Sequence, residues 1–414
     1  YAALTKEPLG VDLARRALTY FLDKQRDDGF IQNYENYMLE TGPALWTIGE
    51  HYRYTRDDAW VRRIAPKLIK ACDYLIAWSR RNRRADLKGR GFGLLDGKVG
   101  DPEDPYRIFM LNGYACLGMS RVAEMLRRTN RRESHRIRRE AETLRRLVRR
   151  AFFEGVARSP VVPLGDGTWC PTAPPWAEGT GPACLYAEKV NAYTHATFVA
   201  RDSIIGPMYL LLQEVLDVRE PAGESLVRYH TEHFYDRNAA FSQPYLSVHP
   251  KVHLMRGEVK AFLSAYCNTV SALADRETYS FWEHLFQASP HKTHEEAEFL
   301  MQTRWMLWME EGETLKLLTG IPRAWMADGR RIELKRIATY FGPVSVTVES
   351  QVGRGVIEAS VEFHSPRRPK AVEIRLPHPD GVRADAVSGG KYDEGKETVT
   401  VTPVRRTVKV SIRF

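Results

Sequence analysis

The stretch IFMLNGYACLGMSRVAEMLRR, residues 108–128, decides the fold of this chain. Its apolar side chains, among them Ile108, Phe109 and Leu117, surround the whole circumference of a helix, and such a helix is buried on all sides. The next helical stretch, residues 132–153, is amphipathic, with apolar side chains on one face and many arginines on the other. An inner helix beside an outer helix predicts one hairpin of an (α/α) toroid, which is a ring of helical hairpins.

The same alternation of inner and outer helices extends to both sides of this pair. Residues 58–82 are charged and amphipathic, whereas residues 202–216 are almost continuously apolar. We expect five hairpins, pairing 11–25 with 38–54, 58–82 with 106–128, 132–153 with 202–216, 222–235 with 255–274, and a short 278–288 with 293–311. A closed ring of six would need a further pair from before Tyr1 or from a partner, including a second copy in a homo-oligomer; otherwise the ring has five hairpins or is open.

The pattern changes after residue 328. Apolar residues such as Val344, Val346 and Val348 then alternate with polar ones, which is typical of half-buried strands. The sequence therefore predicts a mainly α protein of two domains: an (α/α) toroid over 1–328 and a small antiparallel β-sandwich over 329–414.

Composition and charge narrow the range of partners. No stretch of the 414 residues approaches the ~18 consecutive apolar residues of a membrane helix, so no membrane partner is expected. The net charge of +9 is concentrated: residues 121–150 carry twelve arginines against four glutamates. No aromatic residue lies in that stretch, which argues against a nucleic acid and favours a solvated outer face, with an acidic polysaccharide as the open alternative.

In a toroid the ligand binds where loops enter the inner helices, so the side chains at those helix starts are the candidates. Carboxylates beside aromatic, amide and imidazole groups are typical of a sugar site, because rings stack on sugars and polar groups bind hydroxyls. The candidates for sugar binding are Glu35, Tyr37, Trp176, His195, Arg201, Asp202, His253, Trp282, His291 and His294. The carboxylates Asp101 and Asp104 precede a helix, and a charge that caps the helix is an equally good interpretation of them.

A metal or cofactor is not expected. The segment His294-Glu295-Glu296-Ala297-Glu298 is similar to a zinc-binding helix motif, but Glu298 stands where the second histidine would be. Phosphate-binding and dinucleotide-binding glycine motifs are also absent from the sequence.

Three short segments follow one another in a familiar order: Gln25-Arg26-Asp27-Asp28-Gly29, Tyr54-Thr55-Arg56-Asp57, and Thr278-Tyr279-Ser280-Phe281-Trp282-Glu283 followed by His291. These segments resemble those of the six-hairpin glycosidases, most of all the α-L-rhamnosidase group and its relatives. The resemblance implies that Glu283 is the general base, although Thr278 lies further from Trp282 than in the family pattern. The family's acid motif would precede Tyr1, so the acid is missing or is replaced by Glu258, Glu103 or Asp101.

We therefore expect a glycoside hydrolase that cleaves an oligo- or polysaccharide by carboxylate acid/base catalysis. Two alternatives remain open. A polysaccharide lyase acting on a uronate-containing glycan would use Asn191, Tyr193, His195 and Arg201. A non-catalytic carbohydrate-binding subunit would explain the missing hairpin.

Overall fold

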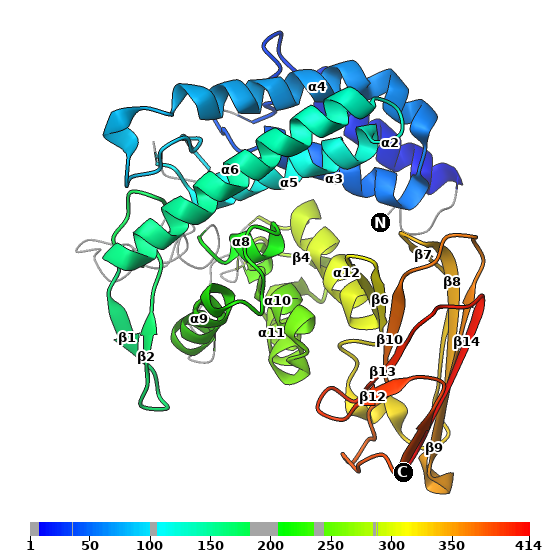
Figure 1. Cartoon of the computed structure of the whole chain (residues 1–414). Coiled ribbons are helices and arrows are strands. Elements are labelled where there is room, and N and C mark those ends of the chain that lie inside the picture. Colours follow the sequence, from blue (N-terminus) through cyan, green and yellow to red (C-terminus); the bar gives the residue numbers. More distant parts are fainter. Residues whose placement is uncertain are drawn as a thin grey trace. The chain divides into compact units, whose positions relative to one another are not determined.

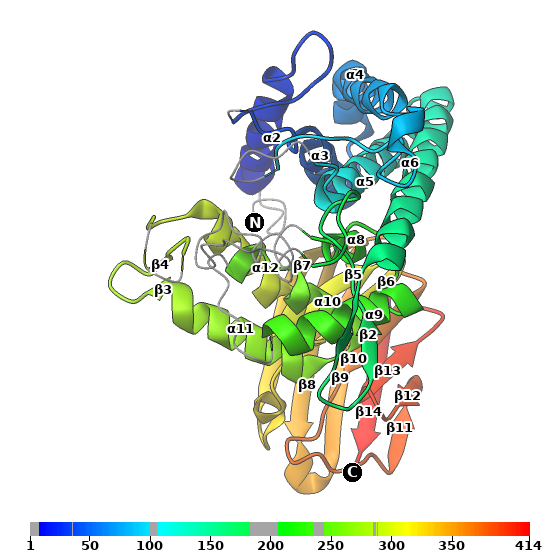
Figure 2. The ribbon, with the colours of Figure 1, turned by 90° about the vertical axis from the view of Figure 1, so that its left-hand side faces the viewer.

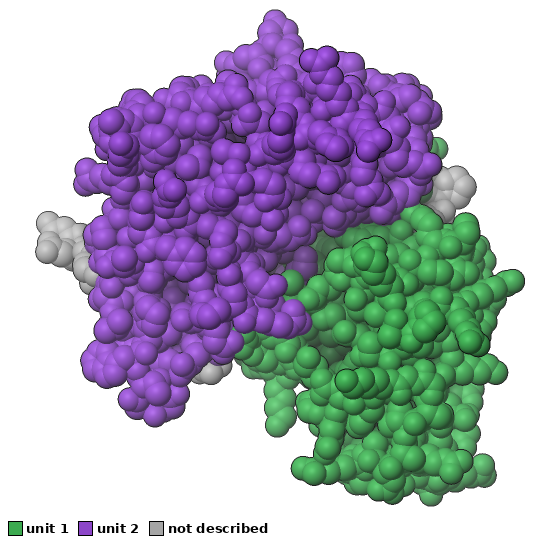
Figure 3. All heavy atoms as spheres, viewed as in Figure 1, with its two compact units in different colours: residues 1–14, 253–270, 296–414 green, residues 15–252, 271–295 purple. Residues whose placement is uncertain are grey.

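The computed structural model describes residues 8–34, 36–99, 106–182, 206–235, 244–284, 287 and 289–414. The chain divides into two compact units (Figure 3). Unit 1 comprises residues 1–14, 253–270 and 296–414, and unit 2 comprises residues 15–252 and 271–295. No helix within the described residues is long and apolar enough to cross a membrane.

Helices dominate the first three hundred residues (Figure 1). They are α2 (Pro8–Asp23), α3 (Thr41–Thr55), α4 (Asp58–Arg81), α5 (Phe109–Leu126), α6 (Arg131–Arg158), α8 (Tyr209–Leu212), α9 (Pro221–His230), α10 (His249–Arg256), α11 (Val259–Leu273) and α12 (Thr293–Leu307). A π-helical turn, Thr231–Tyr235, continues α9.

The two long outer helices, α4 and α6, form as their sequences predict. Side-chain caps begin both: Asp57 accepts a hydrogen bond from the Trp60 amide at 2.9 Å, and Asn130 accepts one from the Glu133 amide at 3.2 Å. Each helix buries one apolar stripe and exposes the opposite, charged face. The helices lie side by side in unit 2 (Figures 1 and 2).

Helix α5 is the inner helix that its sequence predicts, because almost every side chain in it is buried. It packs closely against α3 at glycines. A Cβ atom added at Gly118 would lie 2.5 Å from the carbonyl oxygen of Gly42, and one added at Gly49 would lie 2.3 Å from Cβ of Arg121. The two backbones are therefore too close for any larger residue at these positions.

Replacing Gly118 with valine is expected to lower the free energy of unfolding by about 2–3 kcal/mol, because the new side chain meets backbone atoms that cannot move aside. Urea denaturation measures this. Ala77→Val, at an exposed position of α4, controls for the lower helix propensity of valine and should cost only about 0.5 kcal/mol. Equal stability of the two variants would show that α3 and α5 can separate without penalty.

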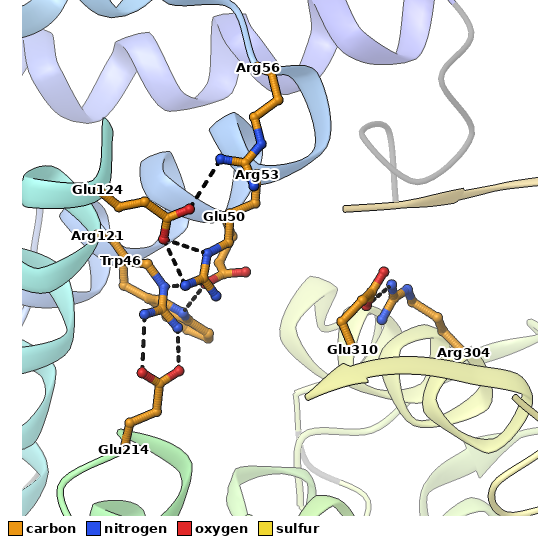
Figure 4. A network of polar contacts seen from close by, with 9 residues as sticks. All are labelled: Trp46, Glu50, Arg53, Arg56, Arg121, Glu124, Glu214, Arg304 and Glu310. Carbon is orange, nitrogen blue, oxygen red and sulfur yellow. Dashed lines mark hydrogen bonds and ion pairs between the residues drawn. The ribbon is translucent and has the colours of Figure 1, made fainter. Parts of the chain in front are cut away.

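A network of arginines and glutamates joins α3, α5 and the segment after α8 (Figure 4). Its members in unit 2 are Trp46, Glu50, Arg53, Arg56, Arg121, Glu124 and Glu214. Arg121 is central: it is 6% exposed and donates to Glu50 at 2.7 Å and to Glu214 at 2.5 Å. Because buried charges are stable only when paired, these contacts fix the two inner helices against each other.

Two buried histidines make unit 2 sensitive to acid. Burial lowers the pKa of His51 to about 4, and burial lowers that of His230 to about 3. In the unfolded chain both would titrate near ~6.5, so between that pH and about 4 only the unfolded state binds the protons. Their contribution to stability is complete above about pH 6.5 and falls by about 1.4 kcal/mol per pH unit per histidine below it.

His51→Phe is therefore expected to reduce the loss of stability between about pH 7 and 5 by about 2 kcal/mol. The ring of His51 already packs edge-on against Trp60, with centroids 5.0 Å apart, so phenylalanine suits the site. Urea denaturation at the two pH values measures the effect, with His135→Phe at an exposed position as the control. An unchanged pH dependence in His51→Phe would mean that His51 is protonated in the folded protein.

Several expected helices differ in the structure. The apolar stretch expected as a helix over 202–216 contains only the short α8, with residues 202–205 outside the described ones. The expected helix over 278–288 is wrong at its start, where β3 (Ala274–Asp275) and β4 (Ser280–Phe281) form a hairpin. Asp275 accepts hydrogen bonds from the Glu277 and Thr278 amides, which favours a turn over a helix. The closed ring of hairpins stays a prediction.

Two short strands follow α6. They are β1 (Val161–Pro163) and β2 (Trp169–Pro171), an antiparallel pair.

Unit 1 contains two five-stranded sheets. Their strands are β5 (Trp308–Glu311), β6 (Thr314–Leu317), β7 (Arg331–Thr339), β8 (Gly342–Gln351), β9 (Val356–Phe363), β10 (Ala371–Arg375), β11 (Ala386–Ser388), β12 (Lys391–Asp393), β13 (Thr398–Val401) and β14 (Thr407–Arg413). One sheet has the order β12-β13-β10-β6-β5 and the other β11-β14-β9-β8-β7. All strand pairs in these two sheets are antiparallel except β6 with β10. The prediction of a helical part followed by a β part is confirmed.

The β part begins earlier than the expected boundary at residue 328. The helix expected over 293–311 ends at Leu307, and the chain continues as β5 because Met309 enters the core of the sheets. That core also includes Leu254 and Phe262, which lie on α10 and α11. The sheets therefore pack against helical residues that the sequence assigns to the toroid.

Candidate functional site

Glu283, the residue expected to be the general base, follows β4 in unit 2. Its carboxylate lies 2.8 Å from Nζ of Lys292 and 3.8 Å from Nε2 of His284, and its side chain is 20% exposed. Backbone hydrogen bonds brace the segment: the Glu283 amide donates to Ser289, and the Lys292 amide donates to Phe281. The structure thus holds a mostly buried carboxylate in a fixed position beside a lysine.

The lysine determines the charge state of this pair. The hydrogen bond to Glu283 raises the pKa of Lys292, so the ammonium group is charged at neutral pH. A positive neighbour in turn favours the ionised form of a carboxyl group. The ionised form is the one that a general base must have before water attack.

A loop rich in aromatic residues precedes α3. Its Tyr34 is one of the groups that raise the pKa of Lys292, as a smaller cause than Glu283 and Glu295. The rings of Tyr34 and Tyr37 meet edge-on at 5.3 Å, and Nζ of Lys98 lies 4.8 Å from the centre of the Tyr37 ring. Tyr34 is 63% exposed, so this loop offers an aromatic face to a ligand.

Hydrogen bonds hold this loop to its neighbours. Glu40 accepts from the amides of Asn33 and Tyr34, and the Met38 amide donates to the carbonyl of Lys98 at 2.8 Å. Because Glu40 immediately precedes α3, the loop is fixed at the start of an inner helix, where sugar-binding residues are expected.

A second aromatic group lies at the start of α5. The rings of Tyr106 and Trp176 stack at 4.6 Å, with 8° between their planes. The Phe109 amide donates to the Pro175 carbonyl and the Ala177 amide donates to the Arg107 carbonyl, so residues 175–177 are joined to the start of α5. Trp176 is 9% exposed because Tyr106 covers one face, so Tyr106 is the partly exposed ring of the pair.

Glu258, a candidate for the general acid, lies in unit 1 and has surroundings opposed to that role. His253 lies 2.7 Å and Arg256 2.6 Å from its carboxylate. Burial raises the pKa of Glu258, but these two hydrogen bonds outweigh it and the pKa is lowered. The carboxyl group is thus held ionised, whereas a proton donor must be protonated.

The remaining candidates divide between described and undescribed residues. Trp282 is half-buried beside Glu283, His291 is exposed one residue before Lys292, and His294 lies 3.2 Å from Glu295. His253 lies in unit 1, where its Nδ1 is hydrogen-bonded to the carboxylate of Glu258. The candidates outside the described residues are Glu35, Asp101, Glu103, Asn191, Tyr193, His195, Arg201 and Asp202.

Lys292 and Lys98 were not selected from the sequence as site residues. Lys292 could have been chosen from the sequence, because it directly follows His291, which belongs to the resemblance to the rhamnosidases. Nothing in the sequence identifies Lys98, since it reaches Tyr37 only through the tertiary fold. In the part of the chain that the structure describes, no group of three or more His, Cys, Asp or Glu side chains is arranged to hold a metal ion.

The fold is similar to that of glycoside hydrolases of known structure. An α-L-rhamnosidase from Dictyoglumus thermophilum matches with a TM-score of 0.54 and 9% identity over 98% of this chain and 44% of that one. A GH78 family rhamnosidase of Bacillus sp. GL1 matches with a TM-score of 0.51 and 10% identity over 90% of this chain and 37% of that one. The chain thus spans less than half the length of either structure. No family model and no curated protein sequence matches the chain.

Proposed function

We propose that this chain provides a glycoside hydrolase with its general base, Glu283, and with aromatic residues that bind sugar. The observation that carries the proposal is the Glu283–Lys292 pair, because it holds an ionised carboxylate beside the loop of Tyr34 and Tyr37. The likeness in fold to two rhamnosidases supports it, and α-L-rhamnosides are the first substrates to test. The arrangement of α3 to α6 is consistent with inner and outer helices of a toroid.

In the proposed reaction Glu283 removes a proton from a water molecule, whose oxygen attacks the anomeric carbon of the sugar. A carboxylic acid on the other face donates its proton to the leaving oxygen as the glycosidic bond breaks. Glu258 is a poor donor because its carboxyl group is ionised. Asp101 and Glu103, ahead of α5, remain the proposed donors within this sequence.

Tyr34, Tyr37 and Tyr106 would bind the sugar. Aromatic faces pack against the apolar C–H face of a pyranose ring, and the charged groups of Lys98 and Lys292 can donate hydrogen bonds to sugar hydroxyls.

A product screen tests the proposal. The protein is incubated with aryl α-L-rhamnosides and with neutral and uronate-containing oligosaccharides, while reducing ends and ultraviolet absorbance are followed together. We expect new reducing ends without a new ultraviolet band. Reducing ends with an unsaturated product would replace hydrolysis by lyase chemistry, and binding without any product would contradict the enzymatic proposal.

A further inference from the structure

The outer faces of α4 and α6 form a strip of exposed positive charge, which we call the basic ridge. Its residues are Arg63, Lys70, Arg132, Arg138, Arg139 and Arg146. All six side chains are exposed, and within the described residues none of them lies within ion-pair distance of a carboxylate. The charge of the ridge is therefore available to a ligand.

The acidic residues between the two helices do not neutralise the ridge, because other arginines already pair with them. Asp73 pairs with Arg136 at 2.7 Å, and Glu140 pairs with Arg80 at 2.5 Å. These pairs also hold α4 and α6 side by side, which Figures 1 and 2 both show. The ridge is thus one surface formed by two helices that ion pairs hold together.

The charges on α6 are regularly spaced. Arg132, Arg139 and Arg146 recur every seven residues, which is close to two helical turns, so they form one straight row with steps of ~10.5 Å. Arg138 lies beside this row. A row of this kind matches an extended polymer that carries negative charge at regular intervals.

The composition of the ridge argues against a single-stranded nucleic acid and against insertion into a lipid surface. The only large hydrophobic side chain exposed on the described α4 and α6 is Phe153, near the end of α6, so the ridge has no aromatic row for stacking bases and no apolar side chains to enter a lipid surface. Arginine, which makes up most of the ridge, binds carboxylate and phosphate groups alike through two parallel hydrogen bonds.

We propose that the basic ridge binds a linear polysaccharide bearing uronate carboxylates. The choice of a glycan rests on the proposed function, because the carbohydrate class comes from the Glu283 site. Binding on the ridge would keep a long substrate on the protein while Glu283 acts on its glycosidic bonds. The substrate of this hydrolase would accordingly be an acidic polysaccharide.

Titration of the whole chain with polygalacturonate tests the proposal, with dextran as a neutral probe. We expect polygalacturonate alone to bind, and binding to be lost at ~1 M salt because exposed charges are then screened. The triple variant Arg132→Gln, Arg139→Gln, Arg146→Gln should raise Kd about tenfold. The matched control, Arg330→Gln, Arg405→Gln, Arg413→Gln, removes the same charge from exposed positions in unit 1 and should bind like the wild type.

Three results would overturn the proposal: no binding of polygalacturonate, equal weakening in both triple variants, or tighter binding of a DNA duplex or of phosphatidylglycerol vesicles. Circular dichroism on both variants controls for folding. The Glu283→Gln variant separates this proposal from the proposed function, because it should bind polygalacturonate normally. If turnover is lost while polygalacturonate still binds, the ridge proposal stands. If polygalacturonate does not bind, the ridge proposal fails but the hydrolase proposal is unaffected.

Discussion

Replacing Glu283 with glutamine is expected to lower the rate of glycoside hydrolysis by about 10²–10⁴-fold, the usual contribution of a general acid or base. Glutamine has nearly the same size and still accepts a hydrogen bond from Lys292, which lies 2.8 Å from the carboxylate. It cannot take a proton from water, so the loss should fall on kcat rather than on KM. Steady-state kinetics on the substrate found in the product screen measure it.

The matched control is Glu277→Gln, which makes the same change at an exposed position six residues earlier and should leave kcat unaltered. A second readout comes from Lys292→Gln. Loss of the positive neighbour should move the acidic limb of the pH–rate profile to higher pH, since the carboxyl group would then be protonated more easily. Full activity of Glu283→Gln would show that the base is another residue.

Replacing Arg304 with methionine is expected to lower the free energy of unfolding of unit 1 by about 3–5 kcal/mol. The side chains of Arg304 and Glu310 are 4% and 1% exposed, and they meet at 2.6 Å (Figure 4). The second oxygen of Glu310 accepts a hydrogen bond from the Tyr340 amide at 3.1 Å. Without Arg304 a buried carboxylate keeps that hydrogen bond but loses its counter-charge, which is the costly half of breaking such a pair.

Two controls identify the cause of this loss. The double variant Arg304→Met, Glu310→Leu removes both charges and should recover most of the stability. Lys370→Met breaks a surface pair with Glu313, whose partners are 76% and 64% exposed, and should cost less than about 1 kcal/mol. Urea denaturation of all three variants measures the differences. An Arg304→Met protein as stable as the Lys370→Met protein would mean that water reaches Glu310.

The sequence predicts those elements whose periodicity is continuous. The apolar circumference of α5 and the one-sided stripes of α4 and α6 each extend over four or more turns, so the burial of these helices follows from the pattern alone. The end of α12 does not follow, because Trp308 and Met309 continue the apolar spacing of the helix but pair with β6 as a strand. In that segment tertiary packing overrides the local pattern.

The sequence predicts those site residues that belong to a recognisable short segment, and it does not predict those that reach the site only through the tertiary fold. Glu283 follows from a short segment that resembles the rhamnosidases, and Tyr37 follows from its place ahead of an inner helix. The lysines were not chosen in this way. Lys98 reaches Tyr37 from a separate loop, and Lys292 reaches Glu283 across a turn that the sequence pattern assigns partly to a helix.

The contact of α3 with α5 at Gly42 and Gly118 has a consequence for how a ligand is accommodated. At this contact the two helix backbones meet directly, and further along, the pair Arg121–Glu50 joins the same two helices. We therefore expect the two helices to move as one body, so that the segments carrying Tyr37 and Tyr106 begin from helix ends at a constant spacing. In the proposed sugar site, adjustment to sugars of different size would then come from rotation of these tyrosine side chains and not from helix movement.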